Sequence, residues 1–346
     1  MDKENFDLDN VRRKTIRLTQ DGLVSAECLH PKSLLPLVIQ PNELQINLET
    51  WVEDNRAFIE LNLLKHGAIL FRGFNIGTVE GFERFVRAVC GEAMQYRERS
   101  SPRSQVGENI YTSTDYPAGL SIFPHNEHSY SHTWPMKLFF YCKTPPSRGG
   151  ETPVADTRRI LKRISPQIVD RFVTKKWMYV RNFGEGVGLP WQSAFQTDDR
   201  ALVEKYCREH DIEFEWRSEG RLKTRQIREA VRRHPESGEL VWFNHATFFH
   251  HSTLDPSILR PLREQFAEED LPNNTYYGDA SPIEDWALDE LREAYRQERV
   301  IFSWREGDLI LLDNMLTAHA REPFAGPRMI LFAMAEPFSY RNEGPH

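Results

Sequence analysis

The chain has 346 residues, of which 40% are hydrophobic, 27% charged and 12% aromatic, and its formal net charge is −7. This profile is typical of a globular protein, because a disordered chain has fewer aromatic residues and a larger charge imbalance. No apolar run reaches the roughly 18 residues of a membrane-spanning helix. The negative balance argues against a dedicated nucleic-acid-binding protein. We therefore expect neither a membrane nor a nucleic acid as a partner.

The first ten residues, MDKENFDLDN, are acidic and lack the apolar segment of a secretory signal peptide. The four cysteines are far apart and form no CxxC pair, which excludes a zinc ribbon or a thioredoxin-type site. We expect buried free thiols in a reducing compartment and a cytoplasmic location. These cysteines are Cys28, Cys90, Cys142 and Cys207.

The first half of the chain mixes helix and strand patterns. Residues 1–45 contain three spaced prolines and are interpreted as an irregular leader. Apolar spacing predicts helices over 48–64 and 79–90. Short apolar runs predict strands at 68–71 and 136–142, the second ended by a Pro/Gly-rich turn.

The last part of the chain predicts one helix followed by strands. Ser281 and Glu284 form a capping box around Pro282, which favours a surface helix over 282–297. Apolar runs then predict three strands, at 300–304, 308–313 and 328–334. Short strands with Gly/Pro turns and no regular βαβ alternation indicate a mainly β fold, a sandwich or barrel with helical insertions.

Two patterns resemble ligand sites but lack the required context. Gly184, Gly186 and Gly188 form GxGxG, but Pro190 follows at once and no P-loop lysine is present, so a mobile loop or lid is the better interpretation. His128 and His132 have the spacing of a helical zinc pair. The residues around them are poor helix formers, and HExxH is absent.

Residues 221–233, RLKTRQIREAVRR, are strongly basic. The simplest interpretation is the solvated face of a helix. The alternative is a docking surface for an acidic partner, such as a carrier protein, or for an anionic substrate.

The strongest chemical pattern is FPHNE, residues 123–127. Pro124 disfavours a helix, and in an extended segment residues i and i+2 share a face, so His125 and Glu127 would stand side by side. His319 follows the apolar strand at 308–313 and is the best candidate for a third ligand. Two histidines and one carboxylate with open positions are typical of non-haem Fe(II) oxygenases. For the HxE pattern by itself, the alternative is a pair of surface residues that binds no metal.

Arg328 lies nine residues beyond His319, across a turn and at the start of a returning strand. A guanidinium fixed there would suit the distal carboxylate of a dicarboxylic cosubstrate, which it can bind through two parallel hydrogen bonds.

HNE, GGET (residues 149–152) and LLDNMLTAHAREPFAGPR, in this order, resemble the taurine dioxygenase (TauD/TfdA-like) family of Fe(II)/2-oxoglutarate oxygenases over residues 65–340. The resemblance implies a double-stranded β-helix, or jelly roll, and one catalytic domain over 1–346, with helical insertions and lid segments at about 155–300. It implies that His125, Glu127 and His319 bind iron. It also implies that Arg328 and Thr152 bind the C5 carboxylate of 2-oxoglutarate, with O2 as the second cosubstrate.

Two departures from the family pattern bear on the substrate. Glu127 stands where most members have Asp, and in this it is similar to the clavaminate-synthase-like branch. The surrounding sequence, residues 111–130, also resembles relatives found beside nonribosomal peptide synthetases that β-hydroxylate amino acids. Ala333 stands where taurine dioxygenase has a further arginine. The resemblance therefore favours hydroxylation at Cβ of an amino acid or amino-acid-derived intermediate, free or carrier-bound, over oxidation of a sulfonate.

Other outcomes stay open. Desaturation, cyclisation or oxidation of a small organic acid would use the same centre, whereas Glu127 argues against halogenation, in which a small residue replaces the carboxylate. A zinc hydrolase, a cupin-type enzyme and a non-catalytic binding protein are the alternatives from other classes. The sequence predicts no oligomeric state.

Several polar residues are candidates for substrate contact, each with ordinary loop or core roles as the alternative. Asn314 is expected to support the ligand strand instead. The candidates are Asn109, Tyr111, Thr112, Arg181, Asn244 and His245.

Overall fold

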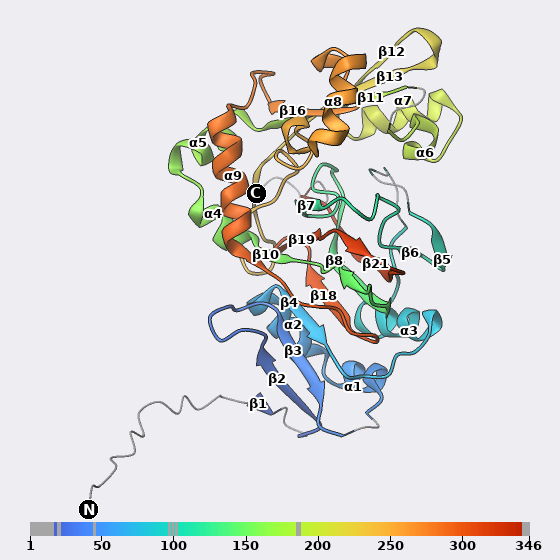
Figure 1. Cartoon of the computed structure of the whole chain (residues 1–346), viewed down its shortest axis with the longest axis vertical. Helices are drawn as coiled ribbons and strands as arrows, with labels where there is room; N and C mark the ends of the chain where they lie inside the picture. Colours follow the sequence, from blue (N-terminus) through green and yellow to red (C-terminus); the bar gives the residue numbers. More distant parts are fainter. Residues whose placement is uncertain are drawn as a thin grey trace, which may run out of the picture.

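The computed structural model describes residues 17–18, 22–43, 46–95, 98, 100, 103–184 and 188–340. Within these ranges strands dominate and several helices are inserted between them, as expected (Figure 1). No helix in the described part of the chain is long and apolar enough to cross a membrane.

The largest sheet has nine strands, and its centre is antiparallel. Its residues alternate between two cores because neighbouring side chains of a strand point to opposite faces. Phe139 of β8 faces the N-terminal helices, whereas Phe140 faces the second sheet. In spatial order the strands are β1 (Arg17–Leu18), β2 (Val24–Cys28), β3 (Leu37–Pro41), β4 (Ala68–Phe71), β18 (Leu309–Asp313), β8 (Trp134–Thr144), β21 (Met329–Phe338), β6 (Ile110–Thr112) and β5 (Gln105–Gly107).

A second, four-stranded sheet packs against the first, and Val154 shares a buried cluster with Phe140 and Phe332 of the large sheet. This sheet carries both candidate iron-binding histidines. In spatial order its strands are β17 (Arg299–Val300), β10 (Val154–Asp156), β19 (Thr317–Arg321) and β7 (Ile122–His125).

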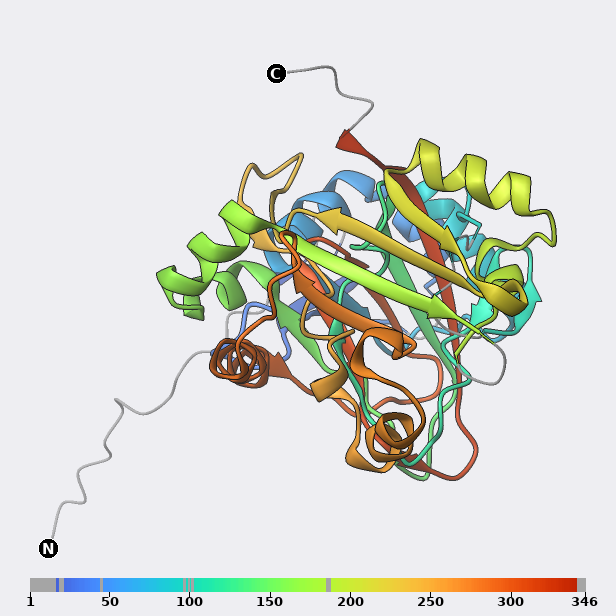
Figure 2. The ribbon, with the colours of Figure 1, turned by 90° about the horizontal axis from the view of Figure 1, so that it is seen from above.

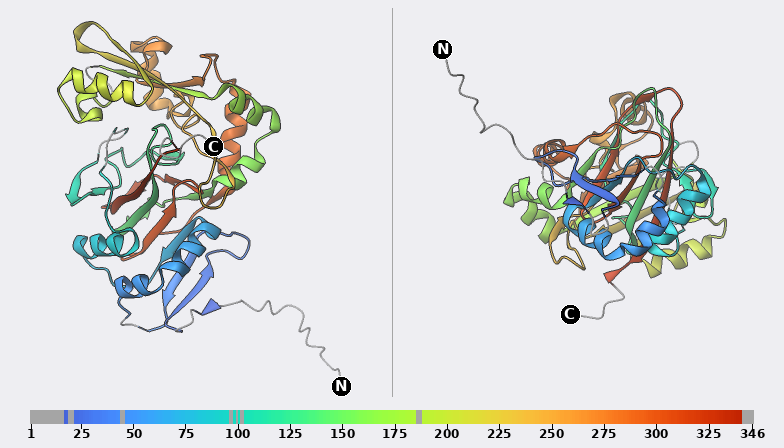
Figure 3. Two further views of the ribbon diagram at one scale, coloured as in Figure 1. Left: turned by 180° about the vertical axis from the view of Figure 1, so that it is seen from behind. Right: turned by 90° about the horizontal axis from the view of Figure 1, so that it is seen from below.

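A third sheet lies at the end of the molecule opposite to β1–β3 (Figures 1 and 3). Figure 2 looks down on this end. The strands are β12 (Ile212–Trp216), β13 (Leu222–Arg228), β11 (Trp177–Phe183) and β16 (Asn273–Tyr277). Two small ladders complete the strands, β14 (Val231–Arg233) with β15 (Leu240–Trp242), and β20 (Phe324–Ala325) with β9 (Arg148–Gly149).

The helices form three groups. The first, α1 (Leu48–Asp54), α2 (Arg56–His66) and α3 (Val79–Cys90), packs on the outer face of the large sheet. The second, α4 (Thr157–Arg163), α5 (Pro166–Lys175) and α9 (Asp285–Glu298), contributes to a separate buried cluster beside the second sheet. The third, α6 (Trp191–Phe195), α7 (Arg200–Glu209) and α8 (Pro256–Gln265), lies near the third sheet, together with short 3-10 turns at Ser218–Gly220, His251–Thr253 and Glu268–Asp270 (Figure 1).

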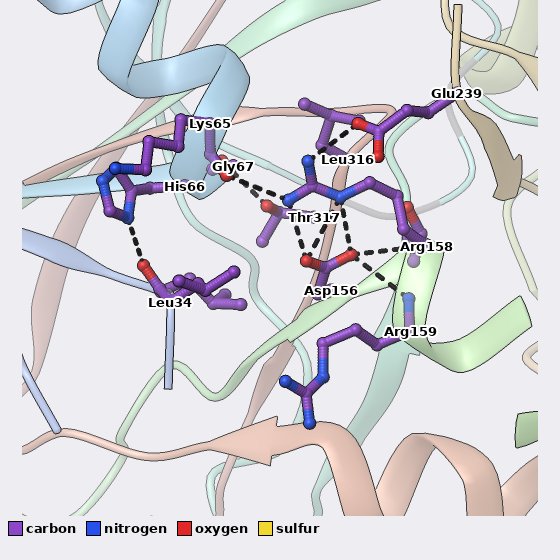
Figure 4. A network of polar contacts seen from close by, with 12 residues as sticks. Leu34, Lys65, His66, Gly67, Asp156, Arg158, Arg159, Glu239, Leu316 and Thr317 are labelled. Atoms are coloured by element: carbon purple, nitrogen blue, oxygen red, sulfur yellow. Dashed lines mark hydrogen bonds and ion pairs between the residues drawn. The ribbon is translucent and has the colours of Figure 1, made fainter. Parts of the chain in front are cut away.

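The beginning of ligand strand β19 is tied to the end of α2 by a buried polar network (Figure 4). Thr317 donates its hydroxyl to the carbonyl of Gly67, and Arg158 donates to the carbonyl of Lys65 and to Asp156. Gly67 has φ +71°, and a Cβ there would lie 2.5 Å from the Thr317 hydroxyl, so only glycine fits. The network fixes the strand two residues before His319.

Several predicted elements need correction. Residues 24–41 of the predicted leader form β2 and β3, and β3 pairs parallel with β4, so this part belongs to the large sheet. Residues 1–16 lie outside the described residues. The helix predicted over 48–64 is two helices that meet at Asn55, whose side chain donates to the Trp51 carbonyl. Of the strand predicted at 300–304, only the first residue is in a strand.

The predicted capping box is also wrong. The last long helix begins after Glu284, and the Ser281 hydroxyl bonds to Asp279 instead. The strands predicted at 68–71, 136–142, 308–313 and 328–334 and the helix over 79–90 are confirmed, with small shifts of the boundaries.

The basic stretch at 221–233 is not a helix face. It forms β13 and β14, and two of its cations are buried. Arg228 is buried and donates to the carbonyls of Tyr130 and His210, and Lys223 donates to the carbonyl of Glu269. This weakens the case for a docking surface at these residues.

Three further predictions concern the histidine pair, the glycine-rich segment and the cysteines. His128 lies in a turn, so no helical histidine pair exists there. Residues 185–187 of the glycine-rich segment lie outside the described residues. All four cysteines are free thiols, as expected, although only Cys142 and Cys207 are fully buried.

Candidate active site

His125, Glu127 and His319 converge in space. His125 ends β7 and is the register partner of His319 on β19, so their rings face each other with centroids 4.4 Å apart. Glu127 lies in the turn that follows β7. Its Oε2 is 4.0 Å from Nε2 of His125 and 3.8 Å from Nε2 of His319, and one ligand atom from each residue lies within 4.8 Å of the others.

The state of these side chains fits a divalent metal. Nδ1 of His125 lies 2.9 Å from the carbonyl of Phe123, which fixes the ring and presents Nε2 to the cluster. Burial lowers the pKa of His125 and lowers that of His319 further, so both rings are neutral ligands. Burial alone would raise the pKa of Glu127, but the positive charge of Arg103 lowers it below its usual value. Two neutral imidazoles and a carboxylate are the donor set of non-haem Fe(II) centres.

Asn314 fixes the backbone of Glu127. Its side-chain oxygen accepts the Glu127 N–H at 2.8 Å, and its amide nitrogen donates to the carbonyls of Glu127 and Pro135, both at 2.8 Å. The expectation that Asn314 supports the ligand segment is therefore confirmed. Asn126 adds a bond from its amide to the Asn314 carbonyl.

Arg103 is a site residue that the sequence did not reveal. Its Nη2 lies 3.0 Å from Oε2 of Glu127, and its guanidinium carbon lies 3.9 Å from the centre of the Phe332 ring. No local motif surrounds it, and 24 residues separate it from Glu127. Its only signal in the sequence is its place before the strands that precede the HxE segment.

Arg328 and Thr152 lie in the same cavity as the triad. Arg328 donates from Nε to the carbonyl of Gly150 and from Nη1 to the hydroxyl of Ser113, both at 3.1 Å. Thr152 accepts from Nε1 of Trp304 at 3.1 Å, which leaves its own hydroxyl hydrogen for another acceptor. Burial lowers the pKa of Arg328 to about 10, so it remains a cation at neutral pH.

Gly150 has to be glycine for this arrangement. Its φ is +70°, and a Cβ would lie 2.7 Å from Pro146 and 3.1 Å from Cδ of Arg328. The GGET motif thus brings the backbone close enough for its carbonyl to orient the arginine.

The cavity has a volume of about 760 Å³ and is lined by both polar and apolar side chains. Its polar lining includes the triad, Arg103, Ser113, Thr152 and Arg328. Its apolar wall includes Ile258 and Leu262, which stand one turn apart on α8, a helix without buried residues. Other residues of the apolar wall are Leu189, Phe248, Phe249, Leu254, Leu271 and Pro272.

Within the described residues, the six candidates for substrate contact are not among the cavity-lining side chains. The Asn109 amide donates to the Ala93 carbonyl, and the Thr112 hydroxyl accepts the Ser104 N–H. Tyr111 is buried in the cluster between the large sheet and the second sheet.

The other three are buried. Arg181 is buried with its guanidinium 4.5 Å from the Phe183 ring, and Asn244 donates to the Ala230 carbonyl. His245 contacts the Ser129 hydroxyl, and its ring centre lies 5.6 Å from that of His125, so it is a neighbour of an iron-ligand candidate.

Ala333 requires a correction as well. Its side chain belongs to the core on the helix side of β21, whereas Phe332 faces the cavity side. An arginine at 333 would enter the core, so its absence does not bear on a sulfonate substrate. Besides Arg328, the arginines Arg103 and Arg321 line the cavity.

Comparison with known proteins decides the family. Residues 31–334 match the model of the taurine catabolism dioxygenase TauD, TfdA family. The chain belongs to this family. This membership confirms the expected dioxygenase class, the jelly-roll fold and the cofactors, Fe(II) and 2-oxoglutarate.

Individual relatives of this TauD/TfdA dioxygenase agree with the family assignment. It is 38% identical to the dapdiamide synthesis protein DdaC of Enterobacter agglomerans over 82% of this chain and 87% of that protein. It is 28% identical to a clavaminate synthase-like protein of Arabidopsis thaliana, over 82% and 86%. Among solved structures, PvcB of Pseudomonas aeruginosa shares the fold with a TM-score of 0.56 and 16% identity, over 92% of this chain and 93% of that one.

Proposed function

We propose that this dioxygenase binds Fe(II) through His125, Glu127 and His319 and binds the C5 carboxylate of 2-oxoglutarate through Arg328 and Thr152. The observation that carries the proposal is the convergence of both sets of residues on one cavity. Arg328 and Thr152 would have no task in a zinc hydrolase or a cupin-type enzyme, because only a dicarboxylate requires a second anchor there. When bound, Fe(II) with 2-oxoglutarate and O2 supplies the oxidising chemistry.

The protein's own residues have separate tasks in this scheme. Arg328 is already held by Gly150 and Ser113, so a carboxylate meets a fixed guanidinium. Phe248, whose ring lies 4.6 Å from that of His125, and the apolar wall beyond it limit the access of water to the reacting C–H bond.

The proposed reaction is hydroxylation of an unactivated C–H bond, at Cβ, of an amino-acid-derived natural-product intermediate. The relatives named for dapdiamide synthesis and for clavaminate synthase support an amino-acid-derived substrate. The apolar wall supports a substrate with an apolar portion beyond the reacting carbon. A carrier-bound form of the substrate is part of the proposal, as is a cytoplasmic location, which the free thiols support.

An anaerobic titration tests the centre. Fe(II) with 2-oxoglutarate is expected to give a weak visible charge-transfer band, and His125→Ala or His319→Ala is expected to remove it. An unchanged band in either variant contradicts the metal assignment.

A substrate screen tests the reaction. Succinate formation is compared over free amino acids and their carrier-bound aminoacyl forms, and the product mass is measured. Gain of one oxygen atom supports hydroxylation, whereas loss of two hydrogens identifies desaturation or cyclisation. Turnover of a sulfonate alone contradicts the proposed substrate class.

A further inference from the structure

Arg103 and Glu127 form a buried ion pair at the edge of the proposed metal centre. Nη2 of Arg103 lies 3.0 Å from Oε2 of Glu127, and their side chains are 5% and 3% exposed. The same Oε2 faces Nε2 of both histidines, at 4.0 Å and 3.8 Å. The oxygen that points toward the other two ligands is therefore in direct contact with a fixed cation.

A second contact keeps the Arg103 guanidinium in place. It lies over the ring of Phe332, with its central carbon 3.9 Å from the ring centre. Phe332 is fully buried and packs against Phe140, whose ring centre lies 5.0 Å from that of His319. One aromatic cluster thus supports both the arginine and a histidine of the triad.

Glutamate needs this support more than aspartate does. Its side chain has one more rotatable bond, so fixing its carboxylate costs more conformational entropy. Asn314 bonds to the backbone of Glu127, whereas Arg103 bonds to its carboxylate. The contact with Arg103 therefore acts directly on the orientation of the carboxylate.

We infer that Arg103 is a positioning residue that holds the Glu127 carboxylate in the single orientation that meets His125 and His319. This inference rests on the proposed function, since it assigns to Arg103 a task in the same metal centre. Two other roles for Arg103 predict different results. If Arg103 acted only as a nearby positive charge, it would weaken metal binding, and its removal would tighten it. If Arg103 bound the substrate, its removal would change only the substrate KM.

Anaerobic Co(II) titration, followed by the visible absorption of the bound metal, measures this role without turnover. Arg103→Gln is expected to weaken Co(II) binding by about tenfold or more, as for other partners of metal ligands, and to change the shape of the absorption band. Arg103→Lys keeps the charge but loses the planar fork, so an intermediate affinity is expected. Arg232→Gln is the matched control, because it removes an arginine from the Trp134 ring outside the cavity.

A double-mutant cycle makes the test specific. If Arg103 acts through Glu127, Arg103→Gln has no further effect on Co(II) affinity in a Glu127→Ala background. Unchanged or tighter Co(II) binding by Arg103→Gln, an equal loss in both backgrounds, or an effect confined to the substrate KM each overturns the inference.

Two controls keep these outcomes interpretable. Thermal unfolding without metal checks that the variants fold, and Arg103→Lys carries the comparison if the Gln variant does not. Failure of the proposed function would give a different result. The His319→Ala variant would then bind Co(II) as tightly as the wild-type protein does.

Discussion

Asn314 binds the backbone of Glu127 twice, accepting its N–H and donating to its carbonyl, each at 2.8 Å. Asn314 follows β18 of the large sheet, whereas Glu127 follows β7 of the second sheet. The contact therefore ties a proposed iron ligand to the opposite sheet and fixes it before any metal binds.

Replacing Asn314 is expected to affect both stability and metal binding. Asn314→Ala removes three buried hydrogen bonds and leaves backbone groups without partners, which we expect to lower the free energy of unfolding by about 3 kcal/mol. Denaturant unfolding without metal measures this. Asn314→Asp keeps the acceptor and serves as the partial control; equal stability of wild type and Asn314→Ala would contradict the role.

Arg328→Met is expected to raise the KM for 2-oxoglutarate by about a hundredfold or more, because a buried charge pair between the arginine and the carboxylate is lost. Succinate formation over a range of 2-oxoglutarate concentrations measures the change. Ser113→Ala, which removes only the hydroxyl that orients Arg328, should raise the KM less. A KM for 2-oxoglutarate that Arg328→Met leaves unchanged would reject this anchor.

Metal removal should destabilise the protein by an amount that grows with the logarithm of the ratio of metal concentration to Kd. A ligand that binds only the folded state adds about 2.7 kcal/mol at a hundred times its Kd. Thermal unfolding of the wild type under anaerobic conditions, with Fe(II) and then with a chelator, should show this difference. His319→Ala should unfold at the same temperature under both conditions, and a metal-dependent shift in that variant would place the metal elsewhere.

Leu262→Asp tests the apolar wall of the cavity. A charge on this face of α8 should raise the substrate KM by about tenfold or more while the KM for 2-oxoglutarate stays within twofold, because burying a carboxylate against an apolar substrate is unfavourable. Arg260→Asp, an exposed position on the same helix, is the matched control. Equal changes in both variants would indicate a general effect of charge on α8.

Local patterns predicted the central strands and α3 because their apolar residues follow the periods of 2 and 3.6 that any buried strand or helix requires. Local patterns were less reliable where pairing with a distant strand decides whether a segment forms a strand. β3 becomes a strand by pairing with β4, and β2 by pairing with β3. The basic stretch at 221–233 becomes two strands because β11 and β12 flank β13 and because β14 pairs with β15.

The sequence by itself determined the types of residue that the chemistry needs: two histidines and a glutamate, with an arginine and a threonine in motifs recognisable along the chain. The tertiary structure decided which side chains meet. His125 and His319 are 194 positions apart and meet only through the pairing of β7 with β19. Arg103, the apolar wall and the position of Ala333 depend on how sheets and insertions pack, and no local pattern encodes contacts between segments so far apart.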